Sequence, residues 1–138
     1  MVTREVTTHR HRRSFDAHVE SIGVSRRWCR SLLAAEGWMT RRANEIELCA
    51  TELVTNAIAH GVGDRVVVRL RHEVGRQLEL DVSSLGAYHG SPTWPPEHVP
   101  PSQTDGRGLL LAYAVSDEME LRCRPASVSV VARFRPTR

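Results

Sequence analysis

The strongest constraint on the fold is an amphipathic helix, which the sequence predicts over residues 41–60. Its apolar side chains recur at spacings of three and four, so they form one stripe along the helix. Thr40 is the expected N-cap, and Gly61 and Gly63 are expected to end the helix. A helix with one such stripe covers a face of a neighbouring layer. The stripe consists of Ile46, Cys49, Ala50, Leu53, Val54 and Ala57.

The patterns around this helix predict an α+β domain. Helices interrupt runs of hairpin strands, which favours a two-layer sandwich with helices packed on one face of a mixed, mostly antiparallel sheet. Residues 87–105 contain five of the seven prolines and are expected to form a long loop. The other predicted elements are strands over 7–15, 65–72, 77–84, 119–123 and 127–135, and helices over 20–36 and 106–116.

The length of 138 residues favours a single domain over residues 1–138, with residues 1–12 as a flexible basic tail. No run of 18 apolar residues is present, so no membrane span is predicted. The basic N-terminal segment is not followed by an apolar region, so no secretory signal is predicted. The three cysteines are scattered, which favours a reducing, cytoplasmic setting.

The chain contains no lysine, because all 19 of its basic residues are arginine. This excludes a P-loop lysine, the strand lysine of eukaryotic-type kinases and Schiff-base catalysis. Charge is also uneven: +5 over residues 1–42, −7 over residues 43–121 and +5 over residues 122–138. A uniformly basic nucleic-acid binder does not have this pattern. An acidic middle between basic ends suits protein contacts, or is a solvated surface of uneven charge.

Three polar side chains follow one another at intervals of four on the 41–60 helix. Glu52, Asn56 and His60 lie at about 0°, 40° and 80° around the helix axis, along one border of the apolar stripe. A carboxylate at such a border can act as a general base, and an asparagine oxygen is a hard ligand suited to Mg²⁺. The alternative is an ordinary polar flank, stabilised by hydrogen bonds between residues four apart.

Glycines mark two further positions. Gly106 and Gly108 flank Arg107 at the start of the 106–116 helix, where the backbone can approach a ligand and the helix N-terminus attracts phosphate. Arg107 could add a bidentate phosphate contact. Gly86 follows the second hairpin strand. Each glycine alone also fits a turn or a flexible helix start.

Together, these features resemble the Bergerat-type ATP-binding fold shared by Hsp90, gyrase and histidine kinases. The stretch ELVTNAIAHG, residues 52–61, looks like the N box of that superfamily. The stretch GRGLLLAYAVSDEME, residues 106–120, looks like its glycine-rich G2 box. The resemblance extends over residues 15–135 and points in particular to the bacterial anti-sigma-factor serine kinases.

The resemblance implies ATP and Mg²⁺ as cofactors. Asn56 matches the Mg²⁺ ligand of the N box, and Glu52 matches the base for phosphoryl transfer. The resemblance further implies serine kinase activity on an anti-anti-sigma antagonist, binding of a sigma factor and a homodimer, without nucleic-acid or membrane contact. Cofactor contacts are also implied for His60, Ser84, Gly86, Gly106, Arg107, Gly108 and Leu109.

One position departs from the family pattern. The family's G1 box has an aspartate two residues before a glycine, and aligning Gly86 places Ser84 there. Asp81 cannot replace it, because strand alternation points Asp81 to the face opposite Ser84. A neutral hydrogen bond contributes about 1 kcal/mol and a charge-assisted one about 1.5–3 kcal/mol, so adenine affinity would fall about tenfold. The alternative function is therefore a degenerate partner-binding module with weak or no ATP binding.

Two other functions are not predicted. The basic run HRHRR, residues 9–13, lacks the interleaved aromatic residues of a nucleic-acid-binding surface. The seven histidines include no pair with HxxxH spacing, and the cysteines include no CxxC pair. A zinc site is therefore not expected from the sequence.

Overall fold

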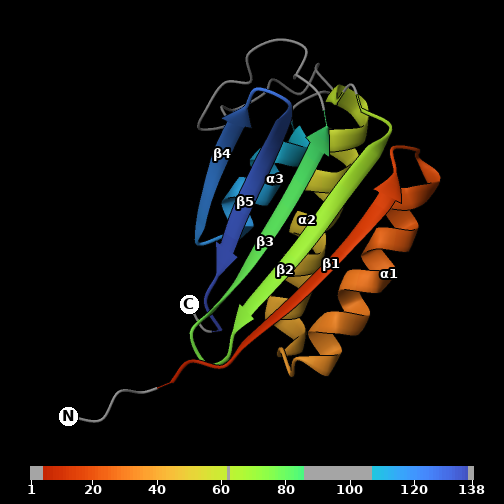
Figure 1. Ribbon diagram of the computed structural model, residues 1–138. Coiled ribbons are helices and arrows are strands. Elements are labelled where there is room, and N and C mark those ends of the chain that lie inside the picture. The colour runs from red at the N-terminus through yellow and green to blue at the C-terminus, as the bar shows by residue number, and fades with distance from the viewer. Residues whose placement is uncertain (1–4, 62, 86–106, 137–138) are drawn as a thin grey trace.

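The computed structural model describes residues 5–61, 63–85 and 107–136 (Figure 1). All the predicted helices and strands are present within these ranges, with ends that differ by one or two residues. The expected loop over 87–105 lies outside the described residues. The elements are β1 (Thr8–Asp16), α1 (Glu20–Ala35), α2 (Thr40–His60), β2 (Arg65–Glu73), β3 (Gln77–Leu85), α3 (Arg107–Val115), β4 (Glu118–Arg124) and β5 (Ser127–Phe134).

The strands form one sheet in the order β1-β2-β3-β5-β4, and every neighbouring pair is antiparallel. The three helices lie behind this sheet and cover one of its faces (Figure 1). The predicted two-layer α+β architecture is confirmed, with a sheet that is antiparallel throughout the described strands. Even α2, with 21 residues, does not qualify as a membrane span, and neither does any other helix in the described ranges.

The core lies between the sheet and the central helix α2. The predicted stripe of α2 is buried, and Ile46, Cys49 and Val54 are fully enclosed. Opposite it, the inner sheet face presents alternate residues of β2, β3 and β5, because side chains of one strand alternate between faces. Paired positions such as Val68 and Val82 therefore meet α2 together. This packing sets the distance between α2 and the sheet.

Two predictions are wrong, one about the N-cap of α2 and one about the flexible N-terminal tail. Met39, not Thr40, is the N-cap of α2, because the Met39 carbonyl accepts the hydrogen bond from Ala43 N at 2.8 Å and Thr40 is already helical. Residues 8–12 are not a flexible tail but half of β1, paired with β2. The polar composition of this segment suggested a tail, although the strand predicted over residues 7–15 includes it. Its His9 and His11 side chains pair with Glu36 of the segment that follows α1.

The ends of the sheet serve as reference points below. The chain direction places the start of β1, the end of α1 and the start of α2 together, and we call this the Glu36 end (Figure 1). The end of α2 and the start of β2 lie at the opposite end, which we call the Gly61 end (Figure 1). Gly37 follows α1 with a φ of 77°, as expected of the glycine that stops a helix.

Candidate active site

The polar row of α2 lies at the Gly61 end. Glu52, Asn56 and His60 are all partly buried, between the enclosed stripe and the exposed side of the helix. This is the border position that the helical spacing predicted. The row follows the C-terminal half of α2, so it leads from the middle of the domain toward Gly61.

The structure brings Glu52 against the first turn of α3. A Cβ atom placed on Gly108 would collide with Glu52 Oε2 and would lie 3.3 Å from its Cδ. A side chain at position 108 would therefore displace this carboxylate from its present place against the α3 backbone. Two motifs 56 residues apart in sequence, the N-box-like and the G2-box-like stretches, thus meet at one point.

A second close contact joins the end of α2 to β3. A Cβ on Gly61 would lie 2.5 Å from the Ala57 carbonyl oxygen and 2.9 Å from Ser84 Cβ. The φ of Gly61 is −73°, so close approach and not backbone strain requires glycine here. The sequence analysis treated Gly61 only as a helix stop. Its place in the N-box-like stretch was the available signal for a site role.

Ser84 is the most informative polar group at this end. Its side chain is buried, and its Oγ has no hydrogen-bond partner among the described residues. Leaving a buried hydroxyl unpaired costs about 1–3 kcal/mol, so such a group calls for an explanation. A ligand that donates a hydrogen bond to Ser84 Oγ would supply one.

Other predicted site residues have different outcomes. Gly86 and Gly106 lie outside the described residues. Arg107 begins α3, as expected of a residue at the helix start. Leu109 is partly buried and packs against the hydrophobic core, so it anchors α3 to the core. The structure therefore brings together Glu52, Gly108, Gly61 and Ser84 in two contacts at the border of α2.

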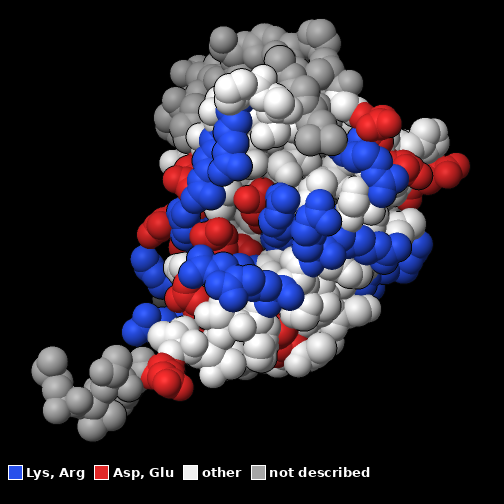
Figure 2. All heavy atoms as spheres, in the orientation of Figure 1, with Lys and Arg blue, Asp and Glu red and all other residues white. Residues whose placement is uncertain are grey.

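The opposite face of the sheet is strongly charged. Figure 2 shows arginine side chains gathered across this face. Asp81 lies there, directly across from Arg69, which confirms that it points away from Ser84. Burial raises the pKa of Asp81, although Arg69 and Arg122 oppose that shift. A hollow of about 380 Å³ on this face has a charged lining of Arg10, Arg12, Arg69, Arg71, Glu79 and Asp81.

A second polar cluster, at the Glu36 end, was missed by the sequence analysis. The Glu36 carboxylate accepts hydrogen bonds from His72 Nδ1 at 2.6 Å, His9 Nδ1 at 2.8 Å and His11 Nε2 at 3.0 Å. Burial alone would raise the pKa of Glu36, but these hydrogen bonds outweigh burial and lower the pKa to about 2. We call these four residues the histidine cluster.

An open antiparallel sheet with helices on one face, and a carboxylate–amide–imidazole row beside a glycine of the next helix, defines an ATPase-type two-layer domain. More closely, the chain belongs to the histidine kinase-like ATPase domain family, whose model matches residues 15–134. Among curated proteins, none matches the chain.

This chain is similar in fold to part of a solved structure, that of the RsbU and RsbW domains of Rv1364c from Mycobacterium tuberculosis. The TM-score is 0.70 at 19% sequence identity, with 92% of this chain covered. The match spans 32% of the longer mycobacterial chain. At this identity the likeness establishes the shared fold.

Proposed function

We propose that this protein is an ATP- and Mg²⁺-dependent serine kinase that phosphorylates an anti-anti-sigma antagonist and also binds a sigma factor. The observation that carries the proposal is the contact of Glu52 with Gly108, because it joins the N-box-like row to the start of α3. Membership of the histidine kinase-like ATPase family supports nucleotide binding at this row. The lack of lysine is compatible with it, since this arrangement uses none.

The residues at the Gly61 end fit ATP and Mg²⁺. Ser84 Oγ is buried and lacks a partner among the described residues, so it can accept a hydrogen bond from the adenine amino group. Gly108 lies in the first turn of α3, where the helix N-terminus attracts phosphate. The amide oxygen of Asn56 would bind Mg²⁺. Further nucleotide contacts are proposed for His60, Gly86, Gly106, Arg107 and Leu109.

In this mechanism ATP supplies the phosphoryl group, and the chain supplies position and charge. Glu52 is the proposed base, which accepts the proton of the substrate serine hydroxyl as that oxygen attacks. The carboxylate is fixed on α2 by the burial of its neighbour Leu53 and lies against the α3 backbone. A base held in this way loses little freedom when the substrate arrives.

The direct test is incubation with labelled ATP, Mg²⁺ and candidate antagonist proteins, scored for phosphoserine. Glu52→Ala should lower the rate by about 10²–10⁴-fold, the usual contribution of a general base. Thr55→Ala is a matched control, because Thr55 is exposed on the same helix. If Glu52→Ala keeps the full rate, Glu52 is not the base.

The same assay mixture tests the proposed partners. Co-elution with a sigma factor and with the antagonist should occur in separate complexes, and the free chain should elute as a homodimer in a cytoplasm-like reducing buffer. If the chain does not co-elute with a sigma factor, the anti-sigma role is rejected and the kinase proposal stands.

Ser84 specifically favours a second candidate, a degenerate partner-binding module of the same fold. A serine hydroxyl is a weaker acceptor for adenine than an aspartate, by about tenfold in affinity. Titration with Mg²⁺-ATP separates the two candidates when native protein is compared with Ser84→Asp. Saturation of native protein at micromolar ATP, with little gain from Ser84→Asp, rejects the degenerate module.

A further inference from the structure

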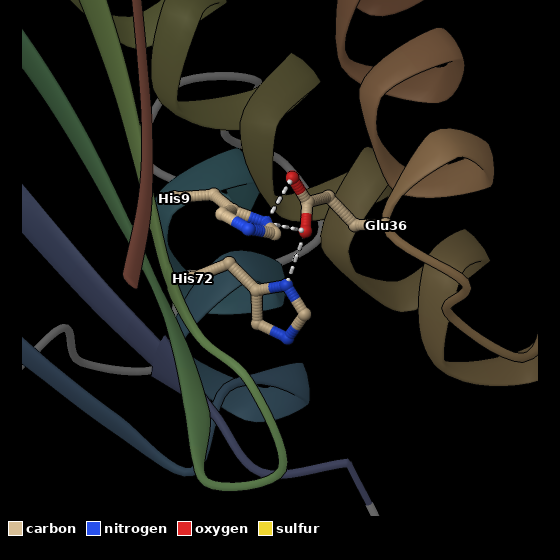
Figure 3. Close-up of side chains that lie close together, drawn as sticks. All are labelled: His9, Glu36 and His72. Carbon is tan, nitrogen blue, oxygen red and sulfur yellow. Dashed lines mark hydrogen bonds and ion pairs between the residues drawn. The ribbon is translucent and has the colours of Figure 1, made fainter. Parts of the chain in front are cut away.

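We infer that the histidine cluster is a binding site for a divalent transition-metal ion, with Zn²⁺ as the best-fitting ion. Figure 3 shows His9, Glu36 and His72 converging from β1, from the end of α1 and from β2. Their ligand atoms all lie within 4.8 Å of one another. The site is at the opposite end of the domain from Glu52 and Ser84, so it is independent of the proposed ATP site.

The spacing of the donor atoms suits zinc. Zinc–ligand bonds of about 2.0–2.1 Å in a tetrahedron separate the ligand atoms by about 3.3 Å. Glu36 Oε2 now lies 2.8 Å from His9 Nδ1 and 2.6 Å from His72 Nδ1. Side-chain rotations that open these contacts by about 0.5–0.7 Å would admit the ion. His11 Nε2 contacts the other carboxylate oxygen, Glu36 Oε1, at 3.0 Å, but it does not belong to the group of ligand atoms within 4.8 Å of one another.

The backbone positions these donors firmly. His9 and His72 are directly opposite each other in the antiparallel β1–β2 pair. The His72 ring also packs against Trp38, with 5.4 Å between ring centroids. Glu36 is fixed at the end of α1, where its N–H donates to Leu32 O at 2.8 Å. A site whose ligands are already converged needs little rearrangement on binding.

Charge also favours a cation at this position. Most carboxylates that form ion pairs in the described part of the chain do so with arginine, whereas Glu36 is paired with three imidazoles. The negative charge of this carboxylate, whose side chain is only 11% exposed, therefore faces imidazoles rather than guanidinium groups. A divalent cation would compensate it. Two nitrogen donors and one oxygen favour Zn²⁺ over Mg²⁺ or Ca²⁺, which prefer oxygen ligands alone.

The ion also has a route into the site. The His9 side chain is 48% exposed, so one face of the cluster is open to solvent while His72 closes the other. Binding would displace a proton from the ligating nitrogen of each histidine. The bound ion would then join the edge strand β1 and its neighbour β2 to the end of α1.

The test is a Zn²⁺ titration of the metal-free full chain by calorimetry, with Co²⁺ as a spectroscopic probe. We expect one Zn²⁺ per chain, a Tm increase of about 4 °C or more at saturation, and visible Co²⁺ bands typical of four-coordinate sites. His9→Ala should weaken binding at least about tenfold and abolish the Tm increase. His9 is partly exposed, so its loss should leave the fold intact.

Two control variants make the result specific. Arg10→Ala changes the neighbouring residue on the opposite face of β1, and Cys123→Ser removes an exposed thiol. Both should bind Zn²⁺ like the native chain. The inference is overturned if no saturable binding occurs, if His9→Ala binds equally well, or if Cys123→Ser abolishes binding. Nucleotide titrations of His9→Ala would be unaffected in either case, which separates this site from the proposed kinase site.

Discussion

The Glu36 carboxylate at one end of the domain and the Ser84 hydroxyl at the other differ in their hydrogen-bond partners. At the Glu36 end, one carboxylate accepts three imidazole hydrogen bonds from two strands. At the Gly61 end, Ser84 Oγ is buried without a partner among the described residues, and two glycines allow close backbone contacts. The first arrangement stabilises the apo protein by itself. The second leaves hydrogen-bonding capacity for a ligand.

A second charged group strengthens the Glu36 end. Arg42, buried in the first turn of α2, donates to Arg135 O at 2.9 Å and Val115 O at 3.2 Å and forms an ion pair with Asp117. Its guanidinium also lies over the Phe134 ring, 5.0 Å from the centroid. One side chain thus ties α2 to the ends of α3 and β5. The comparison teaches that the contacts that stabilise the apo protein and the proposed nucleotide site are concentrated at different ends of the sheet.

The largest effect on stability is expected from Arg42→Ala, which removes the buried Arg42 contacts at the Glu36 end. Removing a buried, multiply bonded charge costs about 3–5 kcal/mol of unfolding free energy, because its partners remain buried and unpaired. Urea denaturation at neutral pH measures the loss. Arg41→Ala, at the exposed neighbouring position, should change stability by less than about 0.5 kcal/mol. Equal losses in the two variants would show that the Arg42 contacts are not stabilising.

Glu36→Gln should have the next largest effect, a loss of about 1–3 kcal/mol at neutral pH, because three imidazoles lose a charged acceptor. Its pH dependence follows from the pKa of Glu36, which is lowered from 4.5 to about 2 in the folded state. The stabilisation is therefore complete above about pH 4.5 and is lost as the pH falls toward 2. Denaturation curves at pH 7 and pH 3 check this. The variant should show a smaller loss over that interval, and an unchanged pH profile would contradict the lowered pKa.

Gly108→Ala should separate stability from function at the Gly61 end. Alanine improves helix propensity by about 1 kcal/mol, so α3 should be no less stable. The new Cβ would displace the Glu52 carboxylate, and phosphoryl transfer should fall at least about tenfold. Kinase assays paired with thermal melts measure both quantities. A variant that is destabilised but keeps full kinase activity would contradict this prediction.

The smallest effect, with the opposite sign, is expected from Ser84→Ala. Removing a buried hydroxyl without a partner should leave stability unchanged or raise it by up to about 1 kcal/mol. ATP affinity should fall, since the proposed adenine acceptor is gone. Thermal melts without nucleotide, followed by an ATP titration, test both statements. A clear loss of apo stability would mean that Ser84 Oγ has a structural role like that of Glu36.

Much of the fold could be predicted from local sequence patterns. The stripe from Ile46 to Ala57 predicted α2, and alternation predicted the hairpin that ends in Ser84. Gly37, at the end of the predicted 20–36 helix, has the left-handed conformation that glycine accepts most easily. These features depend on residues a few positions apart.

Features that depend on distant residues were not accessible in this way. Glu36 and its partners His9 and His72 are 27 and 36 residues apart, so no spacing rule links them. The same distance concealed the partner of the β1 histidines, although the strand itself was predicted. The contact of Glu52 with Gly108 could be expected only through the family resemblance, since it too joins separate elements.

The pairing of β1 with β2 has a consequence for synthesis. Thr8 pairs with Glu73, so Thr8 leaves the ribosome 65 residues before the residue with which it pairs. At about 5–20 residues per second, the segment waits roughly 3–13 s as an unpaired edge. Its sequence THRHRRSFD carries charge and little apolar surface, which discourages association with other nascent chains during that time. The composition that disguises β1 as a tail thus protects it until β2 arrives.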